Sequence, residues 1–157
     1  MKIGLIGAGR LGLCFALLME RAGYTVIASD IREDYVNGLN EKRIDTNEPD
    51  VERLLSDSSK ITFTTNNWDI IEQCDLIYTF VSTPSTRDGD YDVSAIEKVV
   101  QDFTTSSSKL RGKSLVIGCT TNPGDCDRFQ DDLSYFGMDV YYNPEFIAQG
   151  TIIKDLI

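Results

Sequence analysis

The feature that most constrains this sequence is a glycine-rich turn near its amino terminus. Gly7-Ala8-Gly9-Arg10-Leu11-Gly12 fits G-x-G-x-x-G, and it directly follows the apolar run Lys2 to Ile6. From 10 to 22 the apolar residues recur at helical spacing, which predicts a helix that opens on this turn. In such a unit the first glycine permits a tight turn, the second lets backbone N–H groups approach a diphosphate, and the third lets the helix pack on the sheet. The helix N-terminus adds about half a positive charge. Taken alone, the turn also fits a plain strand-to-helix connection, and the dinucleotide site is favoured only together with the acidic residue that follows the next strand.

An acidic residue ends the next predicted strand. Thr25 to Ser29 is β-branched and apolar, and Asp30 follows it, where a carboxylate would accept hydrogen bonds from an adenosine ribose. The alternative is that Asp30 caps the following helix. A carboxylate about 4 Å from a 2′-phosphate costs on the order of 4 kcal/mol per charge pair at an effective dielectric of 20, so NAD is expected over NADP. Arg32 is the nearby cation that could soften this preference.

Strands and helices alternate along the whole chain. The expected strands are Lys2 to Ile6, Thr25 to Ser29, Ile61 to Thr64, Leu76 to Val81, Leu115 to Gly118 and Val140 to Tyr142. The expected helices are 10 to 22, 32 to 43, 68 to 73, 94 to 103 and 125 to 135, with Thr104 to Ser108 as a polar helix exit.

These short apolar strands, joined by helical crossovers, predict an α/β fold with a Rossmann-type doubly wound parallel sheet and helices on both faces. The expected strand order is 3-2-1-4-5-6, with a ligand crevice beyond the carboxyl ends of strands 1 and 4. We expect function in the loops after Ile6, Ser29, Val81, Gly118 and Tyr142.

Composition narrows the chemistry. The chain has 157 residues and a net charge of −10, which predicts one domain and disfavours nucleic acid and membrane surfaces as partners. The absence of histidine removes the commonest general base and zinc ligand. The four cysteines show no zinc spacing, so we expect reduced thiols in a cytoplasmic protein without a metal site. The segment Asp88 to Asp92 lacks the ligand pattern of a calcium loop and is interpreted as a turn with a helix cap.

Later motifs resemble the UDP-glucose/GDP-mannose dehydrogenase family. They are Glu48-Pro49, the V-x-T-P loop Val81 to Pro84, Cys119-Thr120-Thr121, and Asn143-Pro144-Glu145-Phe146 with Gly150. The match covers nearly the whole chain, in the family's order. The resemblance implies that 1–157 is an NAD-binding Rossmann domain, without the family's central helix and carboxyl-terminal substrate domain. The full enzyme would oxidise a nucleotide-sugar alcohol to the carboxylate with two NAD and a cysteine nucleophile from the second domain.

The resemblance also assigns roles to particular side chains. Glu145 matches the glutamate that assists thioester hydrolysis, and Thr120 matches the threonine that helps to hold the water. Asn143 as helix cap, with Pro144 at the first helical position, gives a structural role for the same segment. Cys119 is not expected to be a nucleophile, because no evident basic neighbour lowers its pKa. The candidate cofactor contacts are Gly7, Ala8, Gly9, Arg10, Leu11, Gly12, Asp30, Arg32, Val81, Thr83, Thr120 and Gln149.

The chain departs from the family pattern at several places. Gln149 stands where a second glutamate is usual, Asn122 where proline is usual, and Asp50 where glycine is usual. We expect a nucleotide-sugar partner that is held mainly by the second domain, and a full-length homodimer or higher oligomer. Exposed apolar residues near Ile152, Ile153 and Ile157 would promote self-association of this chain.

Two other functions stay open from the sequence. One is a stand-alone NAD(H)-binding or sensing module without catalysis, which the length and Gln149 both favour. The other is a dehydrogenase of a neighbouring family that acts on hydroxy acids or acyl thioesters. The pairing of Cys119-Thr120 with the Asn143 to Phe146 motif argues against the second alternative.

Overall fold

A computed structural model describes residues 1–105 and 110–157. Strands and helices alternate through most of the chain. The strands are β1 (Lys2–Ile6), β2 (Thr25–Ser29), β3 (Ile61–Thr64), β4 (Leu76–Thr79), β5 (Ser114–Ile117) and β6 (Asp139–Tyr142). The helices are α1 (Arg10–Arg21), α2 (Glu33–Asn40), α3 (Val51–Asp57), α4 (Asn67–Gln73), α5 (Ser94–Thr105), α6 (Asp125–Ser134) and α7 (Ile152–Asp155).

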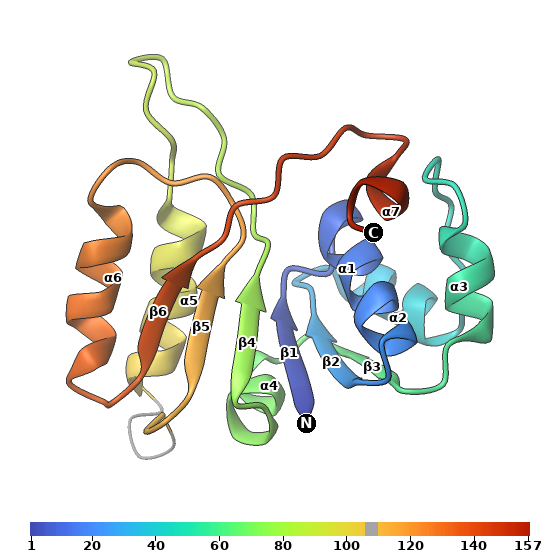
Figure 1. Cartoon of the computed structure of the whole chain (residues 1–157), viewed down its shortest axis with the longest axis horizontal. Coiled ribbons are helices and arrows are strands. Elements are labelled where there is room, and N and C mark those ends of the chain that lie inside the picture. Colours follow the sequence, from blue (N-terminus) through green and yellow to red (C-terminus); the bar gives the residue numbers. More distant parts are fainter. Residues whose placement is uncertain (106–109) are drawn as a thin grey trace.

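The six strands form one parallel sheet in the order β3-β2-β1-β4-β5-β6, which confirms the predicted topology (Figure 1). In register, Ile6 lies beside Ser29 and Thr79, and Thr79 lies beside Ile117. The carboxyl ends of the strands therefore meet at one edge. The order reverses between β1 and β4, and loops that leave the two strands in opposite directions open a crevice there.

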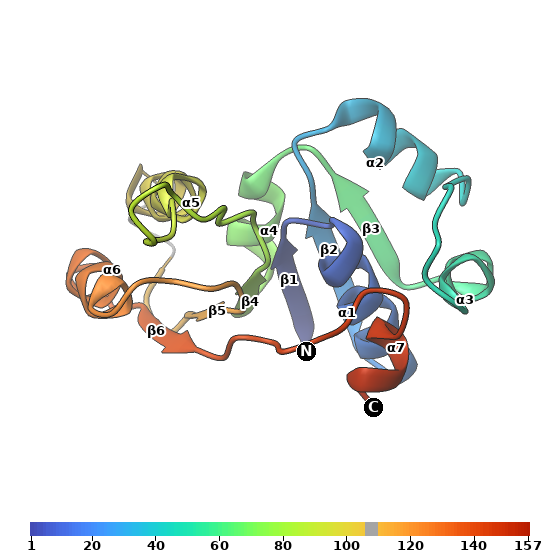
Figure 2. The same cartoon turned by 90° about the horizontal axis from the view of Figure 1, so that it is seen from above.

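Helices cover both faces of the sheet, as Figure 2 shows from above. On one face α1, α2, α3 and α7 pack around buried residues such as Leu17, Leu39 and Leu55. On the other face α4, α5 and α6 pack around Ile70, Phe103 and other apolar side chains. Sequence periodicity located five of these seven helices to within a few residues.

The loop after β4 is an ordered hairpin that projects from the carboxyl edge (Figure 1). Ser85 pairs with Tyr91 in an antiparallel bridge, and Asp92 N–H donates to the Pro84 carbonyl at 2.9 Å. Gly89 turns the tip with a φ of +92°. Asp92 then accepts a hydrogen bond from Ser94 N–H at 2.9 Å, where α5 begins. The interpretation as turn and helix cap is confirmed.

The segment after β6 is extended, so the prediction of a helix beginning at Asn143 is wrong. Asn143 N–H donates to the Ile117 carbonyl at 2.9 Å, and Glu145 N–H donates to the Gly118 carbonyl at 3.4 Å. These bonds prolong the pairing with β5, and pairing to a neighbouring strand holds the backbone out of a helical path. The segment crosses above the sheet to α7, which lies against α1 (Figure 1).

Two further expectations about the ends of segments need correction. Ile152 and Ile153 are buried with α1 and α3 at 1% and 8% exposure, whereas Ile157 is 86% exposed. The expected self-association surface is therefore largely covered by the domain itself. Of the predicted polar helix exit, Thr104 and Thr105 belong to α5, and 106–109 lie outside the described residues. In the described ranges no helix combines the length and apolar character that a bilayer crossing needs.

A buried carboxylate fixes the end of the crossing segment. Glu48 is 4% exposed; its Oε1 accepts a hydrogen bond from Gly150 N–H at 2.7 Å and its Oε2 accepts one from Ile152 N–H at 3.4 Å. Glu48 is more than a hundred residues away in sequence from Gly150 and Ile152. A carboxylate that accepts backbone N–H groups at a helix start stabilises both the helix and the chain that enters it.

We expect Glu48→Ala to lower the free energy of unfolding by about 1–3 kcal/mol, because two buried N–H groups lose their acceptor. It should also expose the 143–150 segment to proteolysis. Urea titration and limited proteolysis measure both effects, with the exposed Glu52→Ala on α3 as the control that changes neither. Unchanged stability and protection in Glu48→Ala would show that Glu48 is not a tether.

Candidate functional site

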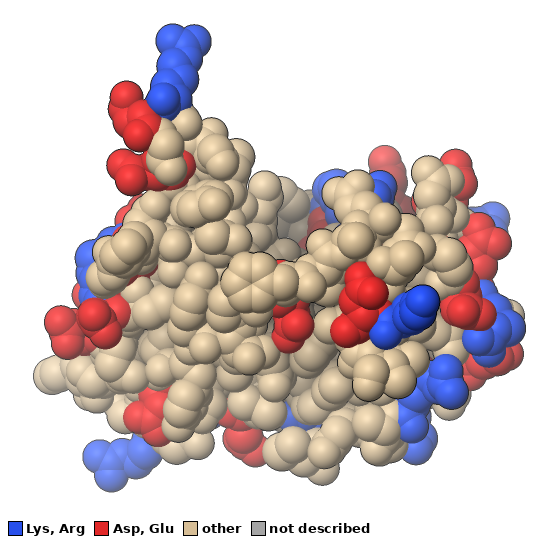
Figure 3. All heavy atoms as spheres, turned by 45° about the horizontal axis from the view of Figure 1, so that its top comes forward, with Lys and Arg blue, Asp and Glu red and all other residues tan. Residues whose placement is uncertain are grey.

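A cavity of about 800 Å³ opens at the carboxyl edge of the sheet. The space-filling view shows this face hollowed beside the projecting hairpin (Figure 3). The volume lies within the usual range of small-molecule sites. Its lining residues come from the ends of β1 and β2, from the loops that follow β1 to β5, and from α1, α4 and α5. They are Ile6, Gly7, Gly9, Leu11, Ser29, Asp30, Ile31, Arg32, Thr65, Asn66, Asn67, Trp68, Phe80, Val81, Ser82, Ala95, Lys98, Val99, Asp102 and Cys119.

The three glycines of the turn have three different surroundings. Gly7 has a φ of +98°, and a Cβ there would lie 2.6 Å from the Phe80 carbonyl oxygen. A Cβ on Gly12 would overlap the Gly7 carbonyl, so the helix can lie this close to the turn only without a side chain. A Cβ on Gly9 would meet no described atom within 4 Å and would point into open space. The predicted turn and packing geometry of Gly7 and Gly12 is therefore present, and Gly9 leaves its backbone accessible.

The amides of the turn divide into two groups. Gly7 and Ala8 donate to the Ser29 carbonyl at 2.9 and 2.8 Å, so their N–H groups are already used. Gly9 is the N-cap of α1 and accepts from Leu13 N–H at 2.8 Å. The N–H groups of the first helical turn, which include Arg10 and Leu11, have no intrahelical acceptor. An anion would therefore bind to the amides that follow Ala8. The Ala8 N–H, which was also a predicted cofactor contact, is already bonded to Ser29.

Asp30 lines the cavity and forms a two-pronged ion pair with Arg32. The two Asp30 oxygens accept from Arg32 Nε at 2.8 Å and from Nη2 at 2.9 Å, and Arg32 N–H adds a third bond at 3.1 Å. Burial alone would raise the pKa of Asp30, but these bonds lower it below its ordinary value. Asp30 does not cap a first-turn amide of α2, whose N-cap is Arg32.

Arg32 is itself fixed by a second contact. Its guanidinium lies 4.2 Å from the centre of the Tyr35 ring, and the Tyr35 hydroxyl donates to the Ala8 carbonyl at 3.0 Å. The acidic strand end and the glycine turn are thus joined through Arg32 and Tyr35.

Sequence reasoning missed the wall that faces Asp30. Ser29 Oγ donates to Asn67 Oδ1 at 2.6 Å, and Asn67 Nδ2 donates to Asp102 Oδ2 at 2.8 Å, which links β2, α4 and α5 beneath the cavity. Trp68, the single tryptophan of the chain, lies beside them and is 41% exposed.

Two signals could have found this wall. The loop after Thr64 belongs to the same carboxyl edge as the loops that the sequence singled out. On α5, the spacing of Ala95, Lys98, Val99 and Asp102 defines one helix face.

The opposite end of the cavity is formed by the loops after β4 and β5. Val81, Ser82 and Cys119 line it, whereas Thr83 is half-buried and Thr120 is exposed just beyond the lining. Burial raises the pKa of the Cys119 thiol to about 11, which agrees with the expectation that it is not a nucleophile.

The remaining predicted residues sit on the crossing segment above the sheet. Glu145 is half-buried, and its Oε1 accepts from Asn143 Nδ2 at 3.0 Å. Burial and then the nearby Glu145 charge raise the pKa of Tyr78. Gln149 Oε1 accepts from Arg10 Nη1 at 2.8 Å, which joins this segment to the start of α1. Glu145 and Gln149 lie outside the cavity lining, although their segment runs beside the end of β5.

A doubly wound sheet with a glycine turn, an open helix N-terminus and an acidic strand end defines a dinucleotide-binding domain of dehydrogenase type. The family model described as "UDP-glucose/GDP-mannose dehydrogenase family, NAD binding domain" matches residues 1–157. The chain belongs to this family, which confirms the resemblance and NAD as the cofactor of the domain.

Individual relatives are similar over nearly the whole chain. An uncharacterised protein of Methanocaldococcus jannaschii is 32% identical over 157 residues, 99% of this chain and 17% of that protein. UDP-glucose 6-dehydrogenase AglM of Haloferax volcanii is 28% identical over 170 residues, 100% of this chain and 39% of that enzyme. A crystal structure of a ternary complex of GDP-mannose dehydrogenase from Pseudomonas aeruginosa superposes with a TM-score of 0.90 at 25% identity, over 99% of this chain and 38% of that one. The chain thus spans at most about two fifths of these relatives.

We expect the carboxyl carbon of Asp30 to titrate below the ordinary aspartate range in an NMR pH series, and Arg32→Met to raise this pKa because the three hydrogen bonds are reduced to one. The pair stabilises the fold above the ordinary pKa of aspartate, and this contribution is lost as the pH falls through the lowered value. An Asp30 pKa that is ordinary in the wild type, or unmoved by Arg32→Met, would contradict the ion pair. Arg53→Met, which removes an exposed pair with Asp50, serves as the control.

Proposed function

We propose that this chain is the NAD-binding domain of a nucleotide-sugar 6-dehydrogenase, with UDP-glucose or a similar sugar nucleotide as substrate. The observation that carries the proposal is the cavity that is lined by Gly9 and Leu11 at the start of α1 and by Asp30 after β2. Relatives that carry the names UDP-glucose 6-dehydrogenase and GDP-mannose 6-dehydrogenase support the substrate class.

The residues present fit the cofactor. The diphosphate would accept hydrogen bonds from the amides of Gly9, Arg10 and Leu11, where the helix dipole favours negative charge. Asp30 would accept hydrogen bonds from the adenosine ribose hydroxyls, since a carboxylate with a lowered pKa stays ionised and is an acceptor only. Bound NAD supplies the hydride acceptor for oxidation of the sugar alcohol.

The base-binding end would be shaped by Ile31, Arg32 and Trp68. Ile31 is 90% exposed and apolar, so a planar base could cover surface that otherwise faces water. At the other end, Val81, Thr83 and Thr120 would surround the nicotinamide. In this orientation the dinucleotide runs along the carboxyl edge from β2 to β5.

We assign Glu145 and Thr120 to hydrolysis of the acyl intermediate. A carboxylate beside the reacting water can take a proton from it and return one. A hydroxyl at Thr120 would orient the water. Asn143, which donates to Glu145, would hold the carboxylate in position. The cysteine nucleophile and most sugar-nucleotide contacts would belong to the second domain of the enzyme, and the oligomer contacts would belong to the family's central helix.

A stand-alone NAD-binding module is the second candidate function, and the Arg10–Gln149 contact favours it. The family's usual glutamate at this position would carry a charge, whereas Gln149 is neutral and its oxygen is already bonded to Arg10. If a purified longer form of the protein oxidised no sugar nucleotide but bound NAD, this second function would replace the first.

NAD should quench the fluorescence of Trp68, the only tryptophan, because Trp68 lines the cavity. Gly9→Ala should weaken NAD binding at least about tenfold, because a methyl group would lie where the diphosphate approaches. It should leave thermal unfolding unchanged, since Gly9 has a φ of −64° and a Cβ there is free of contacts. Wild-type protein that shows neither quenching nor calorimetric heat with millimolar NAD would refute the proposal.

Asp30→Ala should weaken NAD by about ten- to a hundredfold, because hydrogen bonds to a charged group contribute about 1.5–3 kcal/mol. It should also abolish discrimination against NADP, since the repulsion of the 2′-phosphate disappears and Arg32 is released. Paired titrations with NAD and NADP test this, with the exposed Asp34→Ala as the matched control. Retained preference for NAD in Asp30→Ala would show that another residue reads the ribose.

A further inference from the structure

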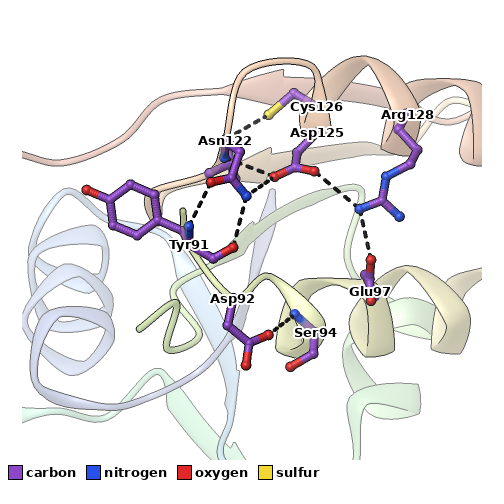
Figure 4. Close-up of polar contacts among 9 residues, drawn as sticks. Tyr91, Asp92, Ser94, Glu97, Asn122, Asp125, Cys126 and Arg128 are labelled. Atoms are coloured by element: carbon purple, nitrogen blue, oxygen red, sulfur yellow. Dashed lines mark hydrogen bonds and ion pairs between the residues drawn. The ribbon is translucent and has the colours of Figure 1, made fainter. Parts of the chain in front are cut away.

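Asn122 joins the two loops that close the far end of the cavity. Its side-chain Oδ1 accepts from Tyr91 N–H at 2.7 Å, and its Nδ2 donates to the Tyr91 carbonyl at 2.9 Å. The amide therefore exchanges both backbone hydrogen bonds with Tyr91, as a neighbouring strand residue would (Figure 4). Tyr91 in turn pairs with Ser85 across the hairpin. Ser85 and Tyr91 thus pair through their main chains, and the Asn122 side chain extends this row from the β4 loop to the β5 loop.

The same asparagine is anchored at the start of α6. Asn122 N–H and Nδ2 both donate to Asp125 Oδ2, each at 2.9 Å. Pro123 and Gly124, with a φ of +87°, make the turn between them, and Asp125 N–H returns a bond to the Asn122 carbonyl at 3.2 Å. Proline at position 122 could make none of the bonds that Asn122 donates, since proline has neither an N–H nor a polar side chain.

An ion pair links this network of hydrogen bonds, which joins Tyr91, Asn122 and Asp125, to α5. Arg128 Nη2 lies 3.3 Å from Asp125 Oδ1 and 2.9 Å from Glu97 Oε1 (Figure 4). Glu97 belongs to the helix that the hairpin enters, one turn after the Asp92 cap. Both Arg128 and Glu97 are about half exposed, so this ion pair adds little stability by itself. Its geometric effect is to keep α5 and α6 in register on either side of the two loops.

This network joins the loop after β4 to the loop after β5. Val81 and Ser82 of the first loop and Cys119 of the second loop line the cavity. Thr83 is next to Ser82, and Thr120 is next to Cys119. We propose that Asn122 is a positioning residue for the nicotinamide half of the dinucleotide: it holds the β4 and β5 loops in the separation that NAD requires, without touching NAD. The inference rests on the proposed NAD binding and deepens it.

The energetic effect follows from preorganisation. Loops that are already ordered lose little conformational freedom when a ligand binds, whereas loops released from each other must be ordered at the expense of affinity. ADP-ribose lacks the nicotinamide ring that the β4 and β5 loops would surround. Its remaining groups would lie mainly against Asp30, the glycine turn and the wall formed by Asn67, Trp68 and Asp102. Loss of the Asn122 hydrogen bonds to Tyr91 and Asp125 should therefore weaken the binding of NAD and leave the binding of ADP-ribose nearly unchanged.

The test is calorimetric titration of wild-type and Asn122→Ala protein with NAD and with ADP-ribose. We expect Asn122→Ala to weaken NAD about tenfold and to change ADP-ribose binding by less than about twofold. Asn40→Ala is a matched control, because Asn40 exchanges the same pair of bonds with the Phe63 backbone, at 3.0 and 3.2 Å, on the far side of the domain. Asn40→Ala should lower the stability of the fold without changing the affinity for NAD relative to that for ADP-ribose.

Equal weakening of both ligands in Asn122→Ala, or weakening of neither, would overturn the positioning role. If wild-type protein bound neither ligand, the proposed function itself would fail and the inference with it, which is a distinct result. If Asn122→Ala did not fold, Asn122→Asp would replace it. The aspartate side chain keeps the shape but cannot donate to the Tyr91 carbonyl or to Asp125, whereas the main-chain N–H still donates to Asp125. NAD should again be weakened selectively, and equal behaviour of the two ligands would again contradict the proposal.

Discussion

The structure of the site depends on the main-chain carbonyl of Ser29, the last residue of β2. This one oxygen accepts the N–H groups of Gly7 and Ala8, which sets the path of the turn between β1 and α1. The path of this turn directs the first N–H groups of α1 toward the crevice where the strand order reverses. Because Asp30 follows Ser29, the same peptide also places the acidic side chain. The hydroxyl of Ser29 extends the link to Asn67. The proposed anion-binding and ribose-binding parts of the cavity are therefore connected directly through Ser29.

The electrostatics of the domain are consistent with an anionic ligand in spite of its overall charge. The chain carries a net charge of −10, which would repel a dinucleotide at long range. At the cavity, the helix N-terminus presents partial positive charge over a few ångströms, where it outweighs a field that salt screens within about 10 Å. Asp30 forms an ion pair with Arg32, whose positive charge offsets part of the carboxylate charge at that end of the site.

Local pattern in the sequence was enough to predict the fold. The apolar runs, the helical spacing and the glycine turn each report on neighbours in sequence, and the register of a parallel sheet then follows from crossover rules. Gly7, Gly9 and Gly12 were predicted with their separate geometries because the spacing of the motif assigns each glycine a different place in the turn. What failed was the Asn143–Pro144–Glu145 segment, whose local preference for a helix start is overridden by hydrogen bonds to the end of β5. Pairs such as Glu48–Gly150 and Asn122–Tyr91 could not be predicted, because no local pattern specifies contacts between groups so distant in sequence.

The most direct test of this account is a crystal structure of the chain with NAD. We expect diphosphate oxygens at hydrogen-bond distance, about 2.9 Å, from the amides of Gly9 to Leu11, with the adenosine ribose on Asp30 and the nicotinamide between Val81 and Cys119. A dinucleotide bound in the reverse direction, or bound away from the α1 N-terminus, would contradict it.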